Sequence, residues 1–148
     1  MLSNKKFNQS TTQNKKYFNE LTDKYGSLGV AEIKTLYTLG VNGEYSTGII
    51  ELEVYSSNGA RNSKQKVMLS FQKGTASNTI TGYNNLVVEN VYKSHNDMNF
   101  EPNITCEIVE NKLVIKATGH GTNNCKYFIC GKCVMSYHGS NGVGIIEN

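Results

Sequence analysis

The chain has 148 residues and a formal net charge of +3, with 14 glycines, one proline, no tryptophan and Arg61 as its single arginine. This length suits one domain with a sizeable core. The small net charge and the single arginine disfavour nucleic acid as the partner, because bidentate base contacts favour Arg. No run approaches the roughly 20 apolar residues that cross a bilayer, and no apolar signal segment follows the N-terminal lysines, so we expect a protein made in the cytosol without a membrane partner.

Residues 1–29 predict an N-terminal arm, because Asn, Gln, Ser, Thr and Lys dominate the segment. The arm is expected to be flexible or partly helical. Its apolar residues have helical spacing within residues 13–25, namely Tyr17, Phe18, Leu21 and Tyr25. The segment Gly26-Ser27-Leu28-Gly29 would then close the arm.

The lysines of the arm allow two functions besides that of a solvated tail. The arm could neutralise nucleic acid inside a protein shell, or it could insert into another protein and anchor the domain. Five lysines lie within residues 1–26, a density that gives only modest affinity for phosphates. We therefore favour a protein anchor.

From residue 30 onward, apolar and polar residues alternate, which is the pattern of half-buried β-strands. The first strand would place Ile33, Thr35, Tyr37 and Leu39 on one face. Later strands are predicted around residues 50–55, 67–72, 85–92, 104–109, 112–117 and 125–137, and Gly131 indicates a bulge or break in the last of them. The clearest hairpin turns at Glu110-Asn111, because only two residues separate its strands.

Residues 30–148 are therefore expected to form one all-β domain, an antiparallel β-sandwich of jelly-roll type. The inward phase of the alternation predicts its core residues: Ile50, Leu52, Val54, Val67, Leu69, Phe71, Ile104, Cys106, Ile108, Leu113 and Ile115.

The cysteines are candidate metal ligands. Three of them lie near two histidines, the set being Cys125, Cys130, Cys133, His120 and His138. Zinc normally takes four ligands from two knuckles, and only one knuckle is present, at residues 130–133. The spacing also resembles part of a plant-type iron–sulfur set, but Cys106 precedes the other cysteines instead of following them. Apolar neighbours favour core residues of a strand, so we expect no metal and no cofactor.

No catalytic set is recognisable in the chain. His95-Asn96-Asp97 could orient an imidazole, but neither a Gly-x-Ser-x-Gly elbow nor an activated cysteine accompanies it. The acidic residues of the strands fall on predicted outer faces, where solvation explains them: Glu51, Glu53, Glu107 and Glu110. We therefore expect a protein that is not an enzyme and has no catalytic residues.

Two loops, expected at one end of the sandwich, are the candidates for a recognition surface. Tyr83 offers a flat face for a sugar ring, and four neighbours offer donors and acceptors around it: Asn84, Asn85, His95 and Asn96. The competing interpretation is that both loops are ordinary solvated turns, since Asn and Gly form turns in their own right.

Two stretches resemble small β-sandwich domains of bacteriophage fibre and receptor-binding proteins. IKTLYTLG and IIELEVYSSNG, within residues 33–59, resemble the opening of such domains, and residues 111–136, beginning NKLVIKAT, resemble their end. The resemblance covers roughly residues 30–138. It is a pattern of strands and turns, so it transfers no site residue. It departs from the fibre pattern because a 29-residue arm replaces a long shaft.

This resemblance implies a structural protein of the virion: a tail fibre, head fibre, decoration protein or adaptor. It also implies other capsid or tail proteins as partners, a homo-oligomer such as a trimer, and a host surface glycan as a candidate ligand. The arm would be the attachment element. Two other functions stay open, a carbohydrate-binding module outside any virus and a small capsid jelly-roll protein with a basic arm.

Overall fold

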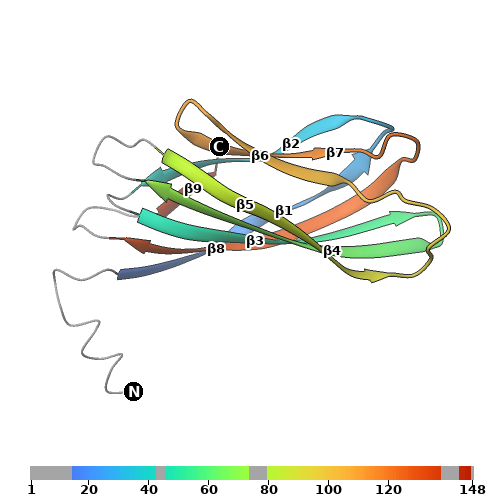
Figure 1. The fold of residues 1–148 in the computed structure, drawn as a ribbon, viewed down its shortest axis with the longest axis horizontal. Helices are drawn as coiled ribbons and strands as arrows, with labels where there is room; N and C mark the ends of the chain where they lie inside the picture. Colours follow the sequence, from blue (N-terminus) through green and yellow to red (C-terminus); the bar gives the residue numbers. More distant parts are fainter. Residues whose placement is uncertain (1–14, 43–45, 74–79, 138–143, 148) are drawn as a thin grey trace, which may run out of the picture.

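The computed structural model describes residues 15–42, 46–73, 80–137 and 144–147. Every regular element in these residues is a β-strand (Figure 1), and they include no helix of the length and apolarity needed to cross a membrane. The strands are β1 (Lys15–Leu28), β2 (Ile33–Asn42), β3 (Ser46–Asn58), β4 (Arg61–Lys73), β5 (Ile80–Lys93), β6 (Asn103–Val109), β7 (Lys112–Thr118), β8 (Cys125–Tyr137) and β9 (Gly144–Glu147).

The strands form two antiparallel sheets that face each other. One sheet has the order β1-β8-β3-β4-β5 and the other the order β6-β7-β2-β9. β1 pairs with β8 in the first sheet and β2 pairs with β7 in the second, so early and late parts of the chain close each sheet together, as in a jelly roll. The predicted antiparallel β-sandwich is confirmed.

The core lies between the sheets, and the predicted inward phase is confirmed. Nine of the predicted core residues are at most 3% exposed: Ile50, Leu52, Val54, Val67, Leu69, Phe71, Ile104, Leu113 and Ile115. Cys106 and Ile108 are partly buried against the same cluster. The hairpin at Glu110-Asn111 is also confirmed. Its two turn residues have φ of 50° and 63°, the left-handed pair that a tight two-residue hairpin turn needs.

Residues 15–28 form strand β1, so the helix expected within residues 13–25 is wrong for this part. Leu21 and Leu28 are both buried, although residues seven apart in a regular strand face opposite sides. A bulge between Leu21 and Lys24 adds the residue that brings both leucines to the core side. Of the residues with helical spacing, Leu21 is buried, whereas Phe18 and Tyr25 are 52% and 79% exposed, so they do not share one buried face. The first 14 residues of the predicted arm lie outside the described residues.

A second bulge interrupts β2. It lies between Thr35 and Tyr37, and it places the neighbours Leu36 and Tyr37 both in the core, while Ile33 is 63% exposed. The predicted single face of Ile33, Thr35, Tyr37 and Leu39 is therefore wrong in its first half, because one inserted residue reverses the alternation.

Gly131 lies within an unbroken β8 and marks no bulge there, since its register with β3 is continuous. The irregularity lies on β1, the neighbouring strand in the same sheet. A Cβ atom at Gly131 would lie 2.4 Å from Leu52 Cδ2 and 2.6 Å from the Glu51 carbonyl oxygen, so a side chain is excluded by the close approach of β3.

One end of the sandwich gathers three connections between the sheets, residues 29–32, 94–102 and 119–124, beside the β3–β4 turn (Figure 1). We call it the crossover end. The Ala31 N–H donates to the His120 carbonyl at 3.0 Å, and the Gly119 N–H donates to the Glu32 carbonyl at 2.7 Å. The start of β1 lies at the other end, where Lys15 pairs with Tyr137.

Candidate functional site

The structure separates the two loops that the sequence analysis assigned to one recognition surface. Tyr83, Asn84 and Asn85 lie inside β5, where Tyr83 pairs with Phe71 and a bulge follows Asn84. The predicted turn at these residues is therefore wrong, because β5 begins earlier than its apolar run suggests. The side chains of these three residues lie outside the described part of the structure.

His95 and Asn96 are exposed in the 94–102 connection, directly after the end of β5. Lys93 lies ten positions after Tyr83 in β5, which corresponds to roughly 33 Å along a strand. The expectation that both loops lie at one end is wrong, and the five residues cannot surround one ligand. Ligand binding by either group alone stays a prediction.

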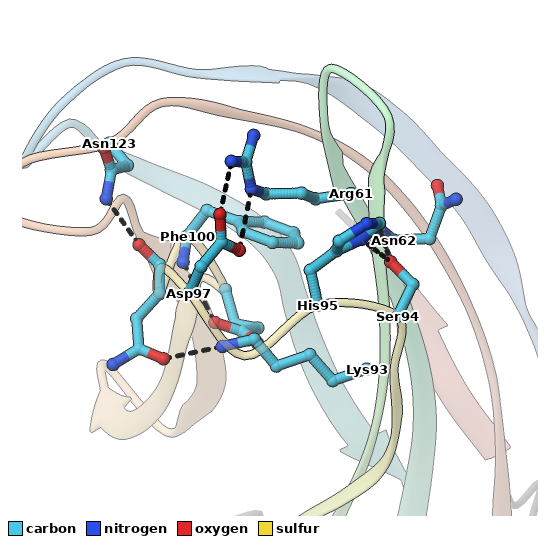
Figure 2. Close-up of polar contacts among 10 residues, drawn as sticks. Arg61, Asn62, Lys93, Ser94, His95, Asp97, Phe100 and Asn123 are labelled. Carbon is cyan, nitrogen blue, oxygen red and sulfur yellow. Dashed lines mark hydrogen bonds and ion pairs between the residues drawn. The ribbon is translucent and has the colours of Figure 1, made fainter.

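The 94–102 connection is held to the β3–β4 turn by an ion pair (Figure 2). Arg61 Nε donates to Asp97 Oδ1 at 3.0 Å, and Arg61 Nη2 donates to Asp97 Oδ2 at 2.5 Å. This two-point contact lowers the pKa of the Asp97 carboxyl to about 2. Ser94 adds two hydrogen bonds to Asn62, through its backbone N–H and its Oγ.

A second polar cluster covers the buried Phe100 at the same end (Figure 2). Lys93 Nζ lies 3.1 Å from Glu101 Oε1, donates to Asn99 Oδ1 at 2.6 Å, and lies 5.7 Å from the centre of the Phe100 ring. Asn123 donates to the Asn99 carbonyl at 2.6 Å. These side chains bind one another across two connections, 94–102 and 119–124, so their evident role is to hold the crossover end together.

The cysteines do not converge on one site. Cys125 and Cys133 face the core, whereas Cys130 faces outward, because residues three apart in a strand lie on opposite faces. Burial raises the pKa of Cys125 to about 11 and that of Cys133 to about 12, so both stay protonated thiols at neutral pH. Within the described residues no three His, Cys, Asp or Glu could share a metal ion. His138 lies outside them, so a metal-free protein stays a prediction.

The most distinctive surface is a line of aromatic side chains on the outer face of the five-stranded sheet. The strand register places Tyr25 opposite Phe128, Phe128 opposite Tyr55, Tyr55 opposite Lys64, and Lys64 opposite Tyr92. Paired residues of an antiparallel ladder point to the same face. One transverse line therefore crosses all five strands. It has aromatic residues on β1, β8, β3 and β5 and a lysine on β4. We call it the aromatic row.

The rings of the aromatic row are exposed to an unusual degree. Tyr25 is 79% exposed, Tyr92 58%, Phe128 41% and Tyr55 37%. Tyr55 and Phe128 lie with their ring centres 6.1 Å apart, and Lys64 Nζ lies 5.1 Å from the centre of the Tyr55 ring. Single exposed apolar residues are ordinary, but neighbouring exposed rings, as at Tyr25, Phe128 and Tyr55, are typical of an interaction surface.

A hollow of about 400 Å³ lies beside the row, over the bulge of β1. Its lining is mostly charged, with four carboxylates and two ammonium groups among Phe18, Glu20, Leu21, Asp23, Glu51, Glu53, Lys66, Cys130, Gly131 and Lys132. Lys132 Nζ lies 3.7 Å from Glu51 Oε2. The hollow thus offers both donors and acceptors along one side of the row.

Glu53 links the hollow to the row. Its carboxylate lies 3.3 Å from Lys64 Nζ, accepts a hydrogen bond from the Tyr55 hydroxyl at 3.5 Å, and accepts another from the Cys130 thiol at 3.6 Å. The hydrogen bond from Lys64 is the largest of the effects that lower the pKa of Glu53. Glu53 therefore stays ionised at neutral pH and helps to orient the Tyr55 ring and the Lys64 side chain.

The aromatic row was not predicted from the sequence. Tyr25 falls in the predicted arm, Tyr55 in the strand predicted around residues 50–55, and Phe128 in the strand predicted around residues 125–137. A signal was present, since Tyr55 stands in the outward phase of the alternation, where polar residues are expected. The alignment of the four rings depends on strand register, which local periodicity does not contain.

No protein-family model and no curated protein matches the chain. Among solved structures, the crystal structure of the tailspike protein of Acinetobacter baumannii phage AM24 is similar over 90% of this chain, with 11% sequence identity and a TM-score of 0.45. This chain spans 28% of the tailspike chain.

Proposed function

We propose that the chain is a structural protein of a bacteriophage virion, attached to the particle through residues 1–14, the part of the predicted N-terminal arm that precedes β1. Its specific role would be that of a tail fibre, head fibre, decoration protein or adaptor. Other capsid or tail proteins would be its partners. By resemblance to fibre proteins, we expect it to form a homo-oligomer, with a trimer as the first state to test. Its role is structural and adhesive, and not enzymatic.

The observation that carries this proposal is that the chain enters the sandwich at one end and the crossover end lies at the other. The chain enters β1 at the end opposite to the crossover end, and β1 runs for 14 residues between the two ends. At about 3.3 Å per residue this is a separation of roughly 40 Å. An arm attached to a particle would therefore hold the crossover end outward. The resemblance of residues 33–59 and 111–136 to phage fibre domains supports the same role.

Truncation tests the attachment. β1 belongs to the five-stranded sheet, so the deletion should stop at residue 14, because removal of residues 1–26 would take away the buried Leu21. The shortened protein should keep a β-rich circular dichroism spectrum and be absent from purified virions by mass spectrometry, whereas the full chain is present. A matched variant carries residues 1–14 in scrambled order, which keeps their charge, and it should also be absent.

Three results would overturn the proposal. The full chain could be missing from purified particles, or the protein lacking residues 1–14 could be incorporated normally. Incubation with neutral oligosaccharides could also release new reducing ends, which would show a hydrolase instead of an adhesive protein. If the protein with residues 1–14 scrambled is incorporated like the full chain, the charge of these residues is sufficient for attachment and their sequence is no specific anchor.

A further inference from the structure

We propose that the aromatic row binds a single chain of a neutral polysaccharide, laid across the strands with its sugar rings on Tyr25, Phe128, Tyr55 and Tyr92. This site replaces the recognition surface expected from the loops. It rests on the proposed function in that an adhesive virion protein needs a ligand on its host, although binding itself is a property of the isolated chain.

The width of the row favours a narrow ligand over a protein partner. The neighbouring line on one side is Cys130, Glu53 and Lys66, and the line on the other side is Ser27, Lys126, Ser57 and Asn62. A stable protein interface buries about 800 Å² on each partner around an apolar centre. One row of rings between two polar lines fits instead an extended chain with apolar faces and polar edges.

The length and spacing of the row fit several sugar units. Neighbouring strands lie about 4.8 Å apart, so the four strand steps from Tyr25 to Tyr92 span roughly 19 Å. One strand step is comparable to the length of a pyranose ring, whose C–H groups can stack on an aromatic face. The charged groups of the hollow, Lys66 and Glu53 among them, can then bind hydroxyl groups on one edge of the sugar chain.

The charge of the hollow favours neutral groups over acidic ones on the edge of the sugar chain that lies there. Four carboxylates and two ammonium groups line the hollow, and Glu51 and Glu53 each already lie near a lysine. An anionic sugar placed there would meet an excess of negative charge. Hydroxyl groups, which both donate and accept, carry no such cost.

Titration with oligosaccharides of defined length tests the site. The probes are neutral glucose and mannose oligomers of two and six units, with a hexamer of galacturonate as the acidic comparison. Isothermal calorimetry gives the affinity, and tyrosine fluorescence reports the contact directly, because the chain has no tryptophan. A neutral hexamer should bind at least tenfold more tightly than its dimer, since only the hexamer spans the row.

Substitutions separate the row from the remaining surface. Tyr25→Thr and Tyr92→Thr remove the two outer rings, and each should weaken binding of the hexamer roughly three- to tenfold, the size of one lost aromatic contact. Tyr25→Phe keeps the ring and should bind the hexamer as tightly as the wild type does. Ile33→Thr is the matched control, because Ile33 is exposed on β2 of the other sheet, and it should leave the affinity unchanged.

Four results would each overturn the proposal. Two concern the ligand: no neutral hexamer binds at millimolar concentration, or the galacturonate hexamer binds more tightly than every neutral one. Two concern the variants: Tyr25→Thr and Tyr92→Thr leave binding unchanged, or they dissolve an oligomer, which would make the row an interface between copies of the chain. These outcomes are independent of virion incorporation. A protein that binds the neutral hexamer but is absent from particles would keep this site and refute the proposed virion role.

Discussion

At the crossover end, Arg61, Lys93 and Asn123 each have a partner in a neighbouring connection, whereas the rings of the aromatic row turn their outer faces to water. The first region uses its side chains to fix the backbone. The second leaves apolar area uncovered, which contributes nothing to folding stability. We infer from this difference that the crossover end is a structural support and that the row is the surface kept available for a ligand.

The largest effect is expected where the backbone itself is in contact at the crossover end. Gly119 lies against Gly29, and a Cβ atom at Gly119 would approach the Gly29 carbonyl oxygen to less than van der Waals contact. Gly119→Ala must push two connections apart, which should cost about 3 kcal/mol of unfolding free energy and lower Tm by roughly 10 °C.

Thermal denaturation with Gly121→Ala as a control checks this prediction. Gly121 lies in the same connection, and a Cβ atom there meets nothing within 4 Å, so its replacement should leave Tm nearly unchanged. Equal losses for the two variants would mean that chain flexibility, and not the contact with Gly29, limits this position.

A smaller effect is expected from the ion pair of Arg61 and Asp97, and it should depend on pH. The pKa of Asp97 is lowered to about 2 in the folded protein from an ordinary value of 3.8. The carboxylate therefore contributes stability above about pH 4, and this contribution is lost as the pH falls toward 2. The difference in Tm between the wild type and Asp97→Asn should be constant above pH 5 and vanish near pH 2.

The partner residue supplies the control for that measurement. In an Arg61→Gln background, Asp97→Asn should change Tm little at any pH, because the contact is already lost. A pH-dependent difference that survives in this background would show that another group binds Asp97.

The smallest effect on stability is expected in the aromatic row, where the effect on binding is largest. Tyr92→Thr exchanges an exposed ring for another strand-forming residue, so the free energy of unfolding should change by less than about 0.5 kcal/mol.

Tyr37→Phe is the contrasting change in the core. Tyr37 is buried and its hydroxyl donates to the Thr22 carbonyl at 2.7 Å, so its loss should cost about 1 kcal/mol. Urea denaturation of both variants measures the two values. A larger loss at Tyr92 than at Tyr37 would mean that the row supports the fold.

Local sequence pattern was sufficient to predict much of the fold. The span of β8 and the Glu110-Asn111 hairpin follow from alternation and turn chemistry, and the inward residues of β3 and β4 follow from an uninterrupted period of two. The pattern failed in β1 and β2, and at Asn85 in β5, where bulges insert residues that the period cannot anticipate.

The candidate site was less predictable than the fold, for a different physical reason. Tyr25, Tyr55 and Phe128 come from three distant segments, and only the pairing of β8 with both β1 and β3 aligns them. Local pattern points instead to Tyr83 and its polar neighbours, because it can display only residues that are close together in the sequence.

The position of β8 also determines when the sheet can form during synthesis. β8 lies between β1 and β3 in space but follows both in the chain, so β1 has no neighbour in its sheet until residues 125–137 have left the ribosome. Such long-range pairing is slow to form, and unpaired strand edges in the meantime favour aggregation. Folding is therefore expected to complete only near the end of translation. Phe128 enters between Tyr25 and Tyr55 in that same step, so a nascent chain has no continuous row of rings with which to hold a sugar.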